Sequence, residues 1–453
     1  MHVGLDFGTT NSTAAVYDGA EVRFIPLDPA AANPAVMRSA LFIGRDGELL
    51  TGKAAIDHYT ASNVGRELVY ERRYIGETEL TLADIGTIVQ SLFAVVDANA
   101  PERLFQSLKT VLRDPSYTST DVYGTRWSIE QLVAALLSEI KHRIEDYIGE
   151  PITSVTIGRP VHYASTPQGD ALALERMRRA CELAGLPQVT FLEEPVAAAY
   201  AYAKEIDALR HILVFDFGGG TLDVTVMALD QHGRRQVLAT GGVPVGGDVL
   251  DSRIVMGALL PYFGAGAVLG PRKLPLPAFL LDGLESWQSI LELHTPRTLG
   301  IIEEAIATSN KPQELKALRS LIRENYGLLL YAEVEQAKCR VSTMPQTEIK
   351  MDAGEIHFCH TLTRIEFERL IGPETRAIAG CVDDVLDAAC LWPDQIDVVL
   401  RTGGSSRIPR FVRLLCDRFG SDKLREQDPF TSVGAGLAVA AWERAQGAHA
   451  RSV

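Results

Sequence analysis

The chain has 453 residues and a formal net charge of −14, because 58 Asp and Glu residues outnumber 44 Lys and Arg residues. This length predicts two or three domains, or one large unit of two lobes. The negative charge argues against nucleic acid or an anionic membrane as the main partner, since both bind clustered positive charge. We expect no membrane span and no secretory signal. Six scattered cysteines without a Cys-x-x-Cys pair are typical of reduced thiols in a cytoplasmic protein.

The first strand ends in the stretch LDFGTTNS, residues 5–12. Small residues between two apolar runs predict a β-hairpin with Gly8, Thr9 and Thr10 at its tip. Such a tip presents backbone N–H groups in a concave arrangement that binds anions such as phosphate. The carboxylate of Asp6 suits Mg²⁺, which binds carboxylates close to substrate phosphates. The stretch therefore predicts a site for a phosphate and a divalent ion.

Helix and strand patterns alternate through the next part of the chain. Residues 129–148 carry apolar side chains at helical spacing. A strand follows and ends at Pro160, and after it come a helix, a short strand and a second helix. The second helix opens near Pro195, which the first turn of a helix tolerates. This alternation predicts an α/β fold.

The segment 212–230, ILVFDFGGGTLDVTVMALD, repeats the pattern of the first hairpin. Asp6 and Asp216 lie 210 positions apart (216 − 6), close to half the chain. This repetition predicts a duplicated architecture with two similar lobes. Two such hairpins facing each other would hold a polyphosphate from both sides. The chain has no GxxxxGK[ST] sequence, so the common Walker loop is absent.

The second half of the chain contains three further features. Five prolines from residue 261 to residue 296 exclude one long helix. They predict an irregular surface insertion, and packing of this insertion on itself is preferred to its being a partner surface. The sequence His357-Phe358-Cys359-His360 resembles a metal motif, but an exposed strand is the preferred interpretation. Residues 397–416 predict a strand, a glycine turn and a helix, where a ligand can approach the backbone closely.

The helix expected at residues 331–343 places three polar side chains on one face, because their spacings are three and four. They are Glu335, Lys338 and Ser342. By themselves they indicate only a solvated charged face.

Five motifs, taken in order, resemble the nucleotide-binding domain of DnaK-type heat-shock chaperones: LDFGTTNS, LEEPVAAAYAYA, VFDFGGGTLDVT, EQAKCRVS and VLRTGGSSRIP. That domain belongs to the superfamily of actin, sugar kinases and heat-shock ATPases. The resemblance implies an α/β, two-lobed actin-like ATPase fold. Each lobe would contain a ribonuclease-H-like mixed sheet flanked by helices, and the lobes would close over ATP or ADP with Mg²⁺.

The resemblance also implies how the chain divides. We expect lobe I at residues 1–208, with a C-terminal helix at 430–453 returning to it. Lobe II would cover 209–429 with an enlarged insertion at about 252–330, as in the short YegD-like members of the family. We expect no peptide-binding domain.

The family's site residues carry over one position at a time. Asp6, Asp216 and Glu194 match residues that hold the metal, mostly through water. Lys109, Glu194 and Asp216 are the expected catalytic residues. After this resemblance, nucleotide contact is the preferred interpretation of the face formed by Glu335, Lys338 and Ser342. The expected nucleotide-binding residues are Gly8, Thr9, Thr10, Asn11, Gly218, Gly219, Gly220, Thr221, Gly246, Gly247, Glu335, Lys338, Ser342, Gly403, Gly404, Ser405 and Arg407.

Three departures from the family pattern bear on activity. Lys109 and Arg72 compete for the place of the catalytic lysine, and we favour Lys109 because a compact ammonium can approach a γ-phosphate and a guanidinium is not its equivalent. Cys339, followed by Arg340, stands where the family has an adenine-stacking arginine. Phe430 stands where the family has a late aspartate.

The resemblance predicts an ATP-binding, slowly ATP-hydrolysing monomer that acts as a nucleotide-dependent switch for an unidentified protein partner in the cytoplasm. A pseudo-ATPase that binds nucleotide without cleaving it is an alternative, as is a filament or scaffold. A small-molecule kinase of the same superfamily is less favoured, because no base aspartate for a substrate hydroxyl is evident.

Overall fold

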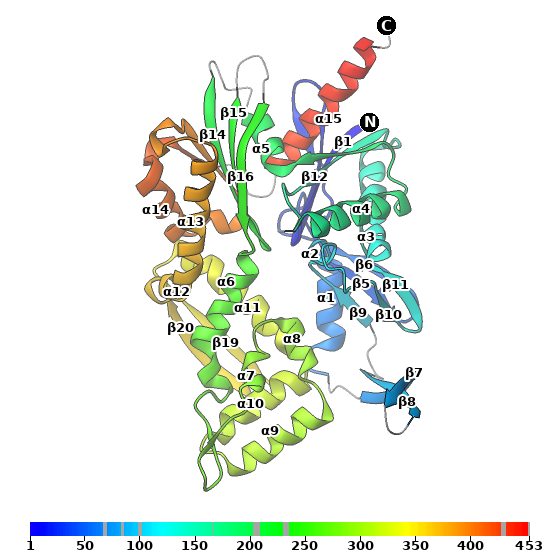
Figure 1. Cartoon of the computed structure of the whole chain (residues 1–453), viewed down its shortest axis with the longest axis vertical. Helices are drawn as coiled ribbons and strands as arrows, with labels where there is room; N and C mark the ends of the chain where they lie inside the picture. Colours follow the sequence, from blue (N-terminus) through cyan, green and yellow to red (C-terminus); the bar gives the residue numbers. More distant parts are fainter. Residues whose placement is uncertain are drawn as a thin grey trace. The chain divides into compact units, whose positions relative to one another are not determined.

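The computed structural model describes residues 1–66, 70–82, 86–97, 102–164, 166–202, 209–229, 235–426 and 432–451. The chain forms two compact units, each assembled from separate stretches of sequence (Figure 1). Unit 1 consists of Met1–His58, Arg103–Leu250 and Ile371–Val453, and unit 2 consists of Tyr59–Glu102 and Asp251–Leu370. The predicted lobe boundaries at 208/209 and 429/430 fall at segments outside the described residues and stay predictions.

The first sheet of unit 1 has the strand order β13-β12-β1-β2-β3. Strand β1 pairs antiparallel with β2 and parallel with β12. Its apolar residues Val3, Leu5 and Phe7 are at most 1% exposed, so burial of this strand anchors the sheet. The strands are β1 (His2–Phe7), β2 (Asn11–Tyr17), β3 (Val22–Phe24), β12 (Ser154–Arg159) and β13 (Val189–Glu193), and β4 (Met37–Arg38) also pairs with β2.

The second sheet of unit 1 has the order β16-β15-β14-β21-β22. Strand β14 pairs antiparallel with β15 and parallel with β21, just as β1 pairs with β2 and β12. The two sheets therefore share one topology, which confirms the duplication that the repeated Asp-Phe-Gly pattern predicts. The strands are β14 (Arg210–Phe217), β15 (Leu222–Leu229), β16 (Arg235–Val243), β21 (Val398–Thr402) and β22 (Leu424–Glu426).

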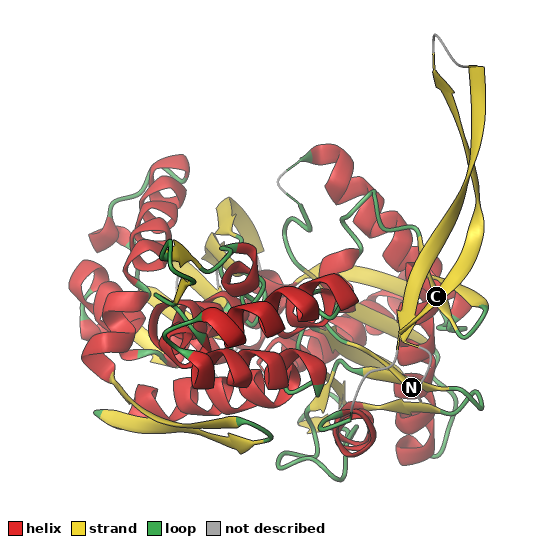
Figure 2. Ribbon diagram, turned by 90° about the horizontal axis from the view of Figure 1, so that it is seen from below, coloured by secondary structure: helices red, strands yellow, loops and turns green. Residues whose placement is uncertain are grey.

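Helices pack against both sheets of unit 1, in agreement with the predicted α/β class. Figure 2 shows the mixture of helices and strands in the described chain. Helix α3 (Ile129–Ile148) has the predicted bounds. It begins at a capping box in which Gln131 N–H donates to Ser128 Oγ and Ser128 N–H donates to Gln131 Oε1. It ends at Gly149, whose φ of 79° is in the left-handed region. Further helices here are α2 (Leu108–Val111), α4 (Pro167–Leu183), α5 (Glu194–Tyr202), α13 (Gly372–Ala388), α14 (Pro409–Phe419) and α15 (Ser432–Arg451).

The remaining elements of unit 1 are short. They are β5 (Leu41–Gly44), β6 (Leu49–Thr51), β10 (Ser119–Val122), β11 (Thr125–Ser128), η4 (Pro393–Gln395), η5 (Gly404–Arg407) and η6 (Ser421–Lys423). Strand β9 (Glu102–Phe105) and helices α1 (Gly52–Asn63) and α6 (Gly247–Ile254) contain residues of both units.

Unit 2 is built mainly from helices around Leu315, Leu318 and Leu321, which are fully buried on α10. The predicted irregular insertion at 261–296 contains only short elements. The elements of unit 2 are β7 (Tyr70–Leu82), β8 (Gly86–Asp97), η2 (Val255–Leu259), η3 (Leu260–Phe263), β17 (Val268–Leu269), β18 (Leu274–Pro275), α7 (Phe279–Asp282), α8 (Trp287–Glu292), α9 (Pro296–Thr308), α10 (Pro312–Arg323), α11 (Gly327–Thr343), β19 (Gln346–Ala353), β20 (Ile356–Thr363) and α12 (Arg364–Leu370).

Two further observations bear on the sequence predictions. Within the described part of the chain, we find no helix with the length and apolar character needed to cross a membrane. All six cysteines are described, and all are free thiols, as the sequence predicts.

Helix α15 approaches its neighbours so closely that only glycine fits at two contacts. A Cβ atom added at Gly436 would lie 1.7 Å from the carbonyl oxygen of Ala197 on α5, and one at Gly4 would lie 2.2 Å from the nitrogen of Ala438 on α15. Small residues therefore set the distance between α15, α5 and β1.

We predict that Gly436→Ala lowers the free energy of unfolding by about 2–4 kcal/mol, because a methyl group cannot fit against backbone atoms without moving a helix. Urea unfolding followed by circular dichroism measures the change. Gly380→Ala in α13 is the matched control, because no atom lies within 4 Å of its added Cβ. It should raise stability by up to about 1 kcal/mol through helix propensity. Equal effects of the two substitutions would contradict the close packing of α15.

Candidate functional site

The tip of the first hairpin is closed by a hydrogen bond from Gly8 N–H to the carbonyl oxygen of Asn11, at 3.0 Å. Ser39 supports it from the side: its Oγ donates to Gly8 O at 2.8 Å and its N–H donates to Thr10 O at 2.9 Å. The buried Oγ1 atom of Thr10 has no hydrogen-bond partner among the described residues. A buried hydroxyl without a partner is costly, so this atom is suited to a ligand.

The tip of the second hairpin is closed in the same way, by a bond from Gly218 N–H to Thr221 O at 3.1 Å. It lies directly against the first tip. A Cβ atom added at Gly219 would be 2.1 Å from Thr10 Oγ1, and one at Gly220 would be 3.4 Å from Thr9 Oγ1. The two tips thus lie in contact, and the contact admits only glycine at position 219.

Two more glycine turns pack against the second tip. The N–H groups of Gly247 and Asp248 donate to the carbonyl oxygens of Gly218 and Gly219 at 3.1 and 3.0 Å. A Cβ atom added at Gly246 would lie 2.1 Å from Gly219 O. These contacts place the turn at Gly246 and Gly247 beside the predicted phosphate hairpin.

The other turn follows strand β21, whose parallel pairing with β14 brings it to the end of that strand. Gly403 has a φ of 78°, and an added Cβ would lie 2.3 Å from Phe217 O, so only glycine fits here. Ser405 Oγ donates to Gly218 O at 3.1 Å, and Gly404 begins the short helix η5. The structure therefore gathers the glycines of three separated motifs.

Four half-buried carboxyl groups and one buried lysine lie behind the tips. Burial and the charge of Glu194 raise the pKa of Asp6 to about 7, although Lys109 opposes this. Burial raises the pKa of Asp216 well above its usual range, and the negative charges of Glu194, Asp223 and Asp6 add to the rise. Raised pKa values at neighbouring carboxyl groups mean that negative charge is poorly compensated here, which favours binding of a cation.

Lys109 forms an ion pair with Glu194, with 2.6 Å between Nζ and Oε1. The two side chains are only 8% and 14% exposed. Burial by itself lowers the pKa of Lys109, but Glu194, Tyr163 and Asp6 outweigh it and raise the pKa, so the ammonium stays charged. The backbone of Arg72 lies on β7, but its side chain is outside the described residues.

Asp223 is a site residue that the sequence reasoning missed. Burial and Glu194 raise its pKa to about 7, against a hydrogen bond from Thr221 and the charge of Lys109. Thr221 Oγ1 donates to Asp223 Oδ2 at 3.2 Å. In the repeated pattern Asp223 follows Asp216 by seven positions, as Thr13 follows Asp6, and each pair is directly opposite in its hairpin. Because the matching position in the first hairpin is Thr13, the repeat gives no signal for this fourth carboxylate.

Arg407, at the end of η5, donates from Nε to Glu426 Oε1 at 2.8 Å. The other oxygen of Glu426 accepts from Arg401 at 3.2 Å, and Arg401 also donates to Ser406 O at 3.1 Å. Arg401 and Glu426 are opposite one another in the parallel pair β21–β22. This ionic network, which the sequence did not indicate, ties the glycine turn to the edge strand of the sheet.

The remaining predicted residues lie on α11 in unit 2 and are described within that unit. Lys338 is buried and donates to Asp251 Oδ2 at 2.7 Å. Ser342 Oγ donates to the carbonyl oxygen of Lys338 at 2.8 Å, and Glu335 is half-buried. These three side chains do not form a simple solvated face, because Lys338 is held in a buried ion pair.

The neighbouring arginine is already engaged. Arg340 donates to Glu333 and to Thr347, at 2.7 and 2.9 Å, while Cys339 is exposed. Phe430, the other departure noted in the sequence, lies outside the described residues.

No three His, Cys, Asp or Glu side chains within the described ranges are arranged to ligate a metal ion directly. In particular, His357 pairs with Asp352 across the β19–β20 hairpin, as an exposed strand would have it. Asp6, Asp216 and Glu194 are hard oxygen ligands in a buried acidic group. They fit Mg²⁺ held through its own water molecules, the mode in which this ion is most often bound.

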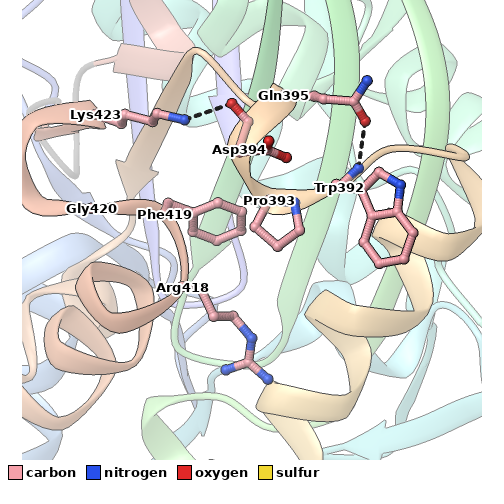
Figure 3. A pocket seen from close by; sticks show the side chains of 8 residues that line it. All are labelled: Trp392, Pro393, Asp394, Gln395, Arg418, Phe419, Gly420 and Lys423. Atoms are coloured by element: carbon pink, nitrogen blue, oxygen red, sulfur yellow. Dashed lines mark hydrogen bonds between the residues drawn. The ribbon is translucent and has the colours of Figure 1, made fainter.

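A surface pocket of about 780 Å³ lies elsewhere in unit 1 and contains none of the predicted site residues (Figure 3). Lys423 Nζ donates to Asp394 O at 2.9 Å, and Trp392 N–H donates to Gln395 Oε1 at 2.8 Å. The lining residues are Trp392, Pro393, Asp394, Gln395, Arg418, Phe419, Gly420 and Lys423.

Two sheets of one topology, whose hairpin tips meet above buried carboxylates, define the actin-like class of fold, as predicted. Residues 2–260 and 321–445 match the family model described as Hsp70 protein. The chain therefore belongs to the Hsp70 family, which confirms the resemblance seen in the sequence. The unmatched residues 261–320 lie inside the segment where an enlarged insertion was predicted.

Curated relatives agree with this assignment. The chain is 27% identical over 451 residues to a chaperone protein dnaK from Cyanidioschyzon merolae, covering 97% of this chain and 61% of the relative. It is 27% identical over 443 residues to a chaperone protein DnaK from Thermus thermophilus, covering 97% of this chain and 60% of the relative. The chain thus spans about three fifths of the length of these relatives.

The buried carboxyl groups give a testable pH dependence. Because the pKa of Asp223 is raised in the folded state, the folded protein keeps a proton that the unfolded chain loses, and stability falls as pH rises from about 4 to 7. Asp223→Asn removes the buried charge. We predict that the change in the free energy of unfolding caused by Asp223→Asn is more favourable at pH 8 than at pH 5, by about 1 kcal/mol or more.

Urea unfolding of the ligand-free protein in a chelator measures this difference. Asp114→Asn is the control, because Asp114 is exposed and hydrogen bonds from Ser116 lower its pKa, so its effect should be the same at both pH values. An Asp223→Asn effect that does not change between pH 5 and pH 8 would contradict a pKa of about 7 for this group.

Proposed function

We propose that this chain binds ATP and ADP together with Mg²⁺, hydrolyses ATP slowly, and acts as a nucleotide-dependent switch in a chaperone-related process. The observation that carries the proposal is the meeting of two glycine-rich hairpin tips around the unpartnered Thr10 Oγ1. Backbone N–H groups from both tips would bind the phosphates, from Gly8 to Asn11 on one side and from Gly218 to Thr221 on the other.

The carboxylates behind the tips have two tasks in this proposal. Asp6, Asp216 and Glu194 would hold Mg²⁺ through water molecules, and the ion supplies neutralisation of phosphate charge when it is bound. Asp216 or Glu194 would orient the attacking water and accept its proton. A carboxyl group whose pKa is raised toward neutrality is well matched to that transfer.

Lys109 would place its ammonium against the γ-phosphate and stabilise the charge that develops there. Two observations support Lys109 rather than Arg72. It is paired with Glu194 inside the acidic group, and its buried position keeps it fixed before any substrate arrives. Positioning of this kind supplies most of the catalysis in phosphoryl transfer, since the protein takes no covalent part.

Gly246, Gly247 and the turn formed by Gly403, Gly404, Ser405 and Arg407 would contact ribose and base. Glu335, Lys338 and Ser342 on α11 are further proposed nucleotide-binding residues, by the resemblance to the family. With Cys339 in the place of an arginine, we propose a weaker hold on adenine than a stacked guanidinium gives.

The relatives named above are chaperones, and we propose a chaperone-related role for this chain in the cytoplasm, as a monomer with a protein partner that reads the nucleotide state. A pseudo-ATPase is the second candidate. It is favoured by one observation, which is that Arg340 is bonded to Glu333 and Thr347 and so does not replace the arginine missing at Cys339.

Isothermal titration with Mg-ATP and Mg-ADP tests the proposal, and we expect binding of both. No heat of binding at millimolar nucleotide would overturn it. Release of phosphate from ATP in a single-turnover experiment separates the ATPase from the pseudo-ATPase.

We predict that Lys109→Ala lowers the rate of ATP hydrolysis by at least about a hundredfold, because it removes the cation at the γ-phosphate. Arg72→Ala is the matched control and should leave the rate within about twofold. If Arg72→Ala abolishes hydrolysis and Lys109→Ala does not, the catalytic cation is Arg72. The Kd for ADP should change little in both variants, since ADP lacks the γ-phosphate.

A further inference from the structure

Ser39, between β4 and β5, makes two hydrogen bonds to the tip of the first hairpin. Its Oγ donates to Gly8 O at 2.8 Å, and its N–H donates to Thr10 O at 2.9 Å. The Oγ of Ser39 also lies 2.9 Å from Ser12 Oγ, and both serines are buried. A hydroxyl has one hydrogen, and that of Ser39 is directed to Gly8 O, so Ser12 is the donor in the pair of serines.

The backbone around Ser39 is itself anchored within unit 1. Ala40 N–H donates to Arg38 O at 2.8 Å, and Ala40 O accepts from the N–H of Gly52, the first residue of α1, at 3.1 Å. Arg38 belongs to β4, which pairs with β2, and Leu41, at the start of β5, is fully buried. Ser39 is therefore a fixed point from which the tip can be held.

Each of the two bonds from Ser39 fixes one peptide unit of the tip. A peptide unit is planar and trans, so its N–H points away from its C=O. Because Ser39 holds Gly8 O, the N–H of Thr9 points away from Ser39. Because it also holds Thr10 O, the N–H of Asn11 points away from it as well. Two donors of the tip thus have their directions set by one residue outside the hairpin.

The second hairpin is supported in the same manner. Ser405 Oγ donates to Gly218 O at 3.1 Å, and Gly218 is the counterpart of Gly8 in the repeated pattern. In both tips, therefore, a serine from a separate segment holds the carbonyl oxygen of the first glycine. Packing of a single buried serine would not explain why the two hairpins share this contact.

We propose that Ser39 is a positioning residue for the phosphates of a bound nucleotide. By holding two carbonyl oxygens, it aims the N–H groups of Thr9 and Asn11 before the ligand arrives. Donors that are already oriented bind more tightly than donors that must first be ordered. This role rests on the proposed function and adds to it a residue that does not touch the ligand.

Ser39→Ala removes the hydroxyl and leaves the N–H bond to Thr10 O in place. We expect the Kd for Mg-ADP to rise about threefold to tenfold, which corresponds to the loss of one hydrogen bond from the tip. Titration calorimetry measures the Kd, and thermal unfolding of the ligand-free protein shows the accompanying change in stability.

Ser12→Ala is the matched control. It removes the same bond between the two serines but keeps the bond from Ser39 to Gly8 O. We expect this variant to melt at a lower temperature than the wild type and to bind Mg-ADP with a Kd within about twofold of it. The double variant with both substitutions leaves neither serine hydroxyl without its partner. It should melt no lower than Ser39→Ala and bind Mg-ADP as weakly.

A Ser39→Ala variant with the Kd of the wild type would overturn the role of Ser39 alone. So would Kd values that simply follow the melting temperatures of the three variants, because Ser39 would then act only through stability. If Ser39→Ala does not fold, the double variant decides, and an unchanged Kd overturns the role. A wild-type protein that binds no nucleotide would overturn the proposed function, and this role with it.

Discussion

The contact between the two hairpin tips is the constraint on which the rest of the site depends. Gly219 and Thr10 are so close that no side chain fits between them, and the second tip is in turn fixed by the turns at Gly246 and Gly403. Gly219 meets the side chain of Thr10, whereas Gly246 and Gly403 meet backbone atoms, which cannot give way as a side chain can. Glycine is needed at these points because the backbones themselves set the shape of the site.

The contact between the tips also brings together carboxylates whose negative charges repel one another. Asp6 and Asp216 are the next-to-last residues of the two strands that lead into the tips. Because the tips meet, the carboxyl groups of these two residues lie in one region with Glu194 and Asp223. A single lysine, Lys109, partly offsets them, and the pKa values of Asp6 and Asp223 stay near 7. The free protein thus carries an electrostatic cost that a bound cation would relieve, which is how binding sites commonly trade stability for function.

Much of this could be predicted from the sequence because the signals are local. The repeated Asp-Phe-Gly pattern indicated two related hairpins, and the sheets do share one topology. Helix α3 was predicted with its full bounds, since its apolar spacing and its cap are properties of consecutive residues. Asp223 was missed because the matching position in the first hairpin is Thr13, so the repeated pattern does not mark a carboxylate there. The network of Arg401, Glu426 and Arg407 had no such signal.

The sequence by itself determined the family, the α/β class, the duplicated hairpins and the residue types at their tips, because each depends on the order of neighbouring residues. Only the tertiary structure decided which distant groups meet, such as Lys109 with Glu194 and Lys338 with Asp251. Burial, and the pKa shifts that follow from it, depend on what the whole fold excludes from water, and no spacing along the chain contains that information.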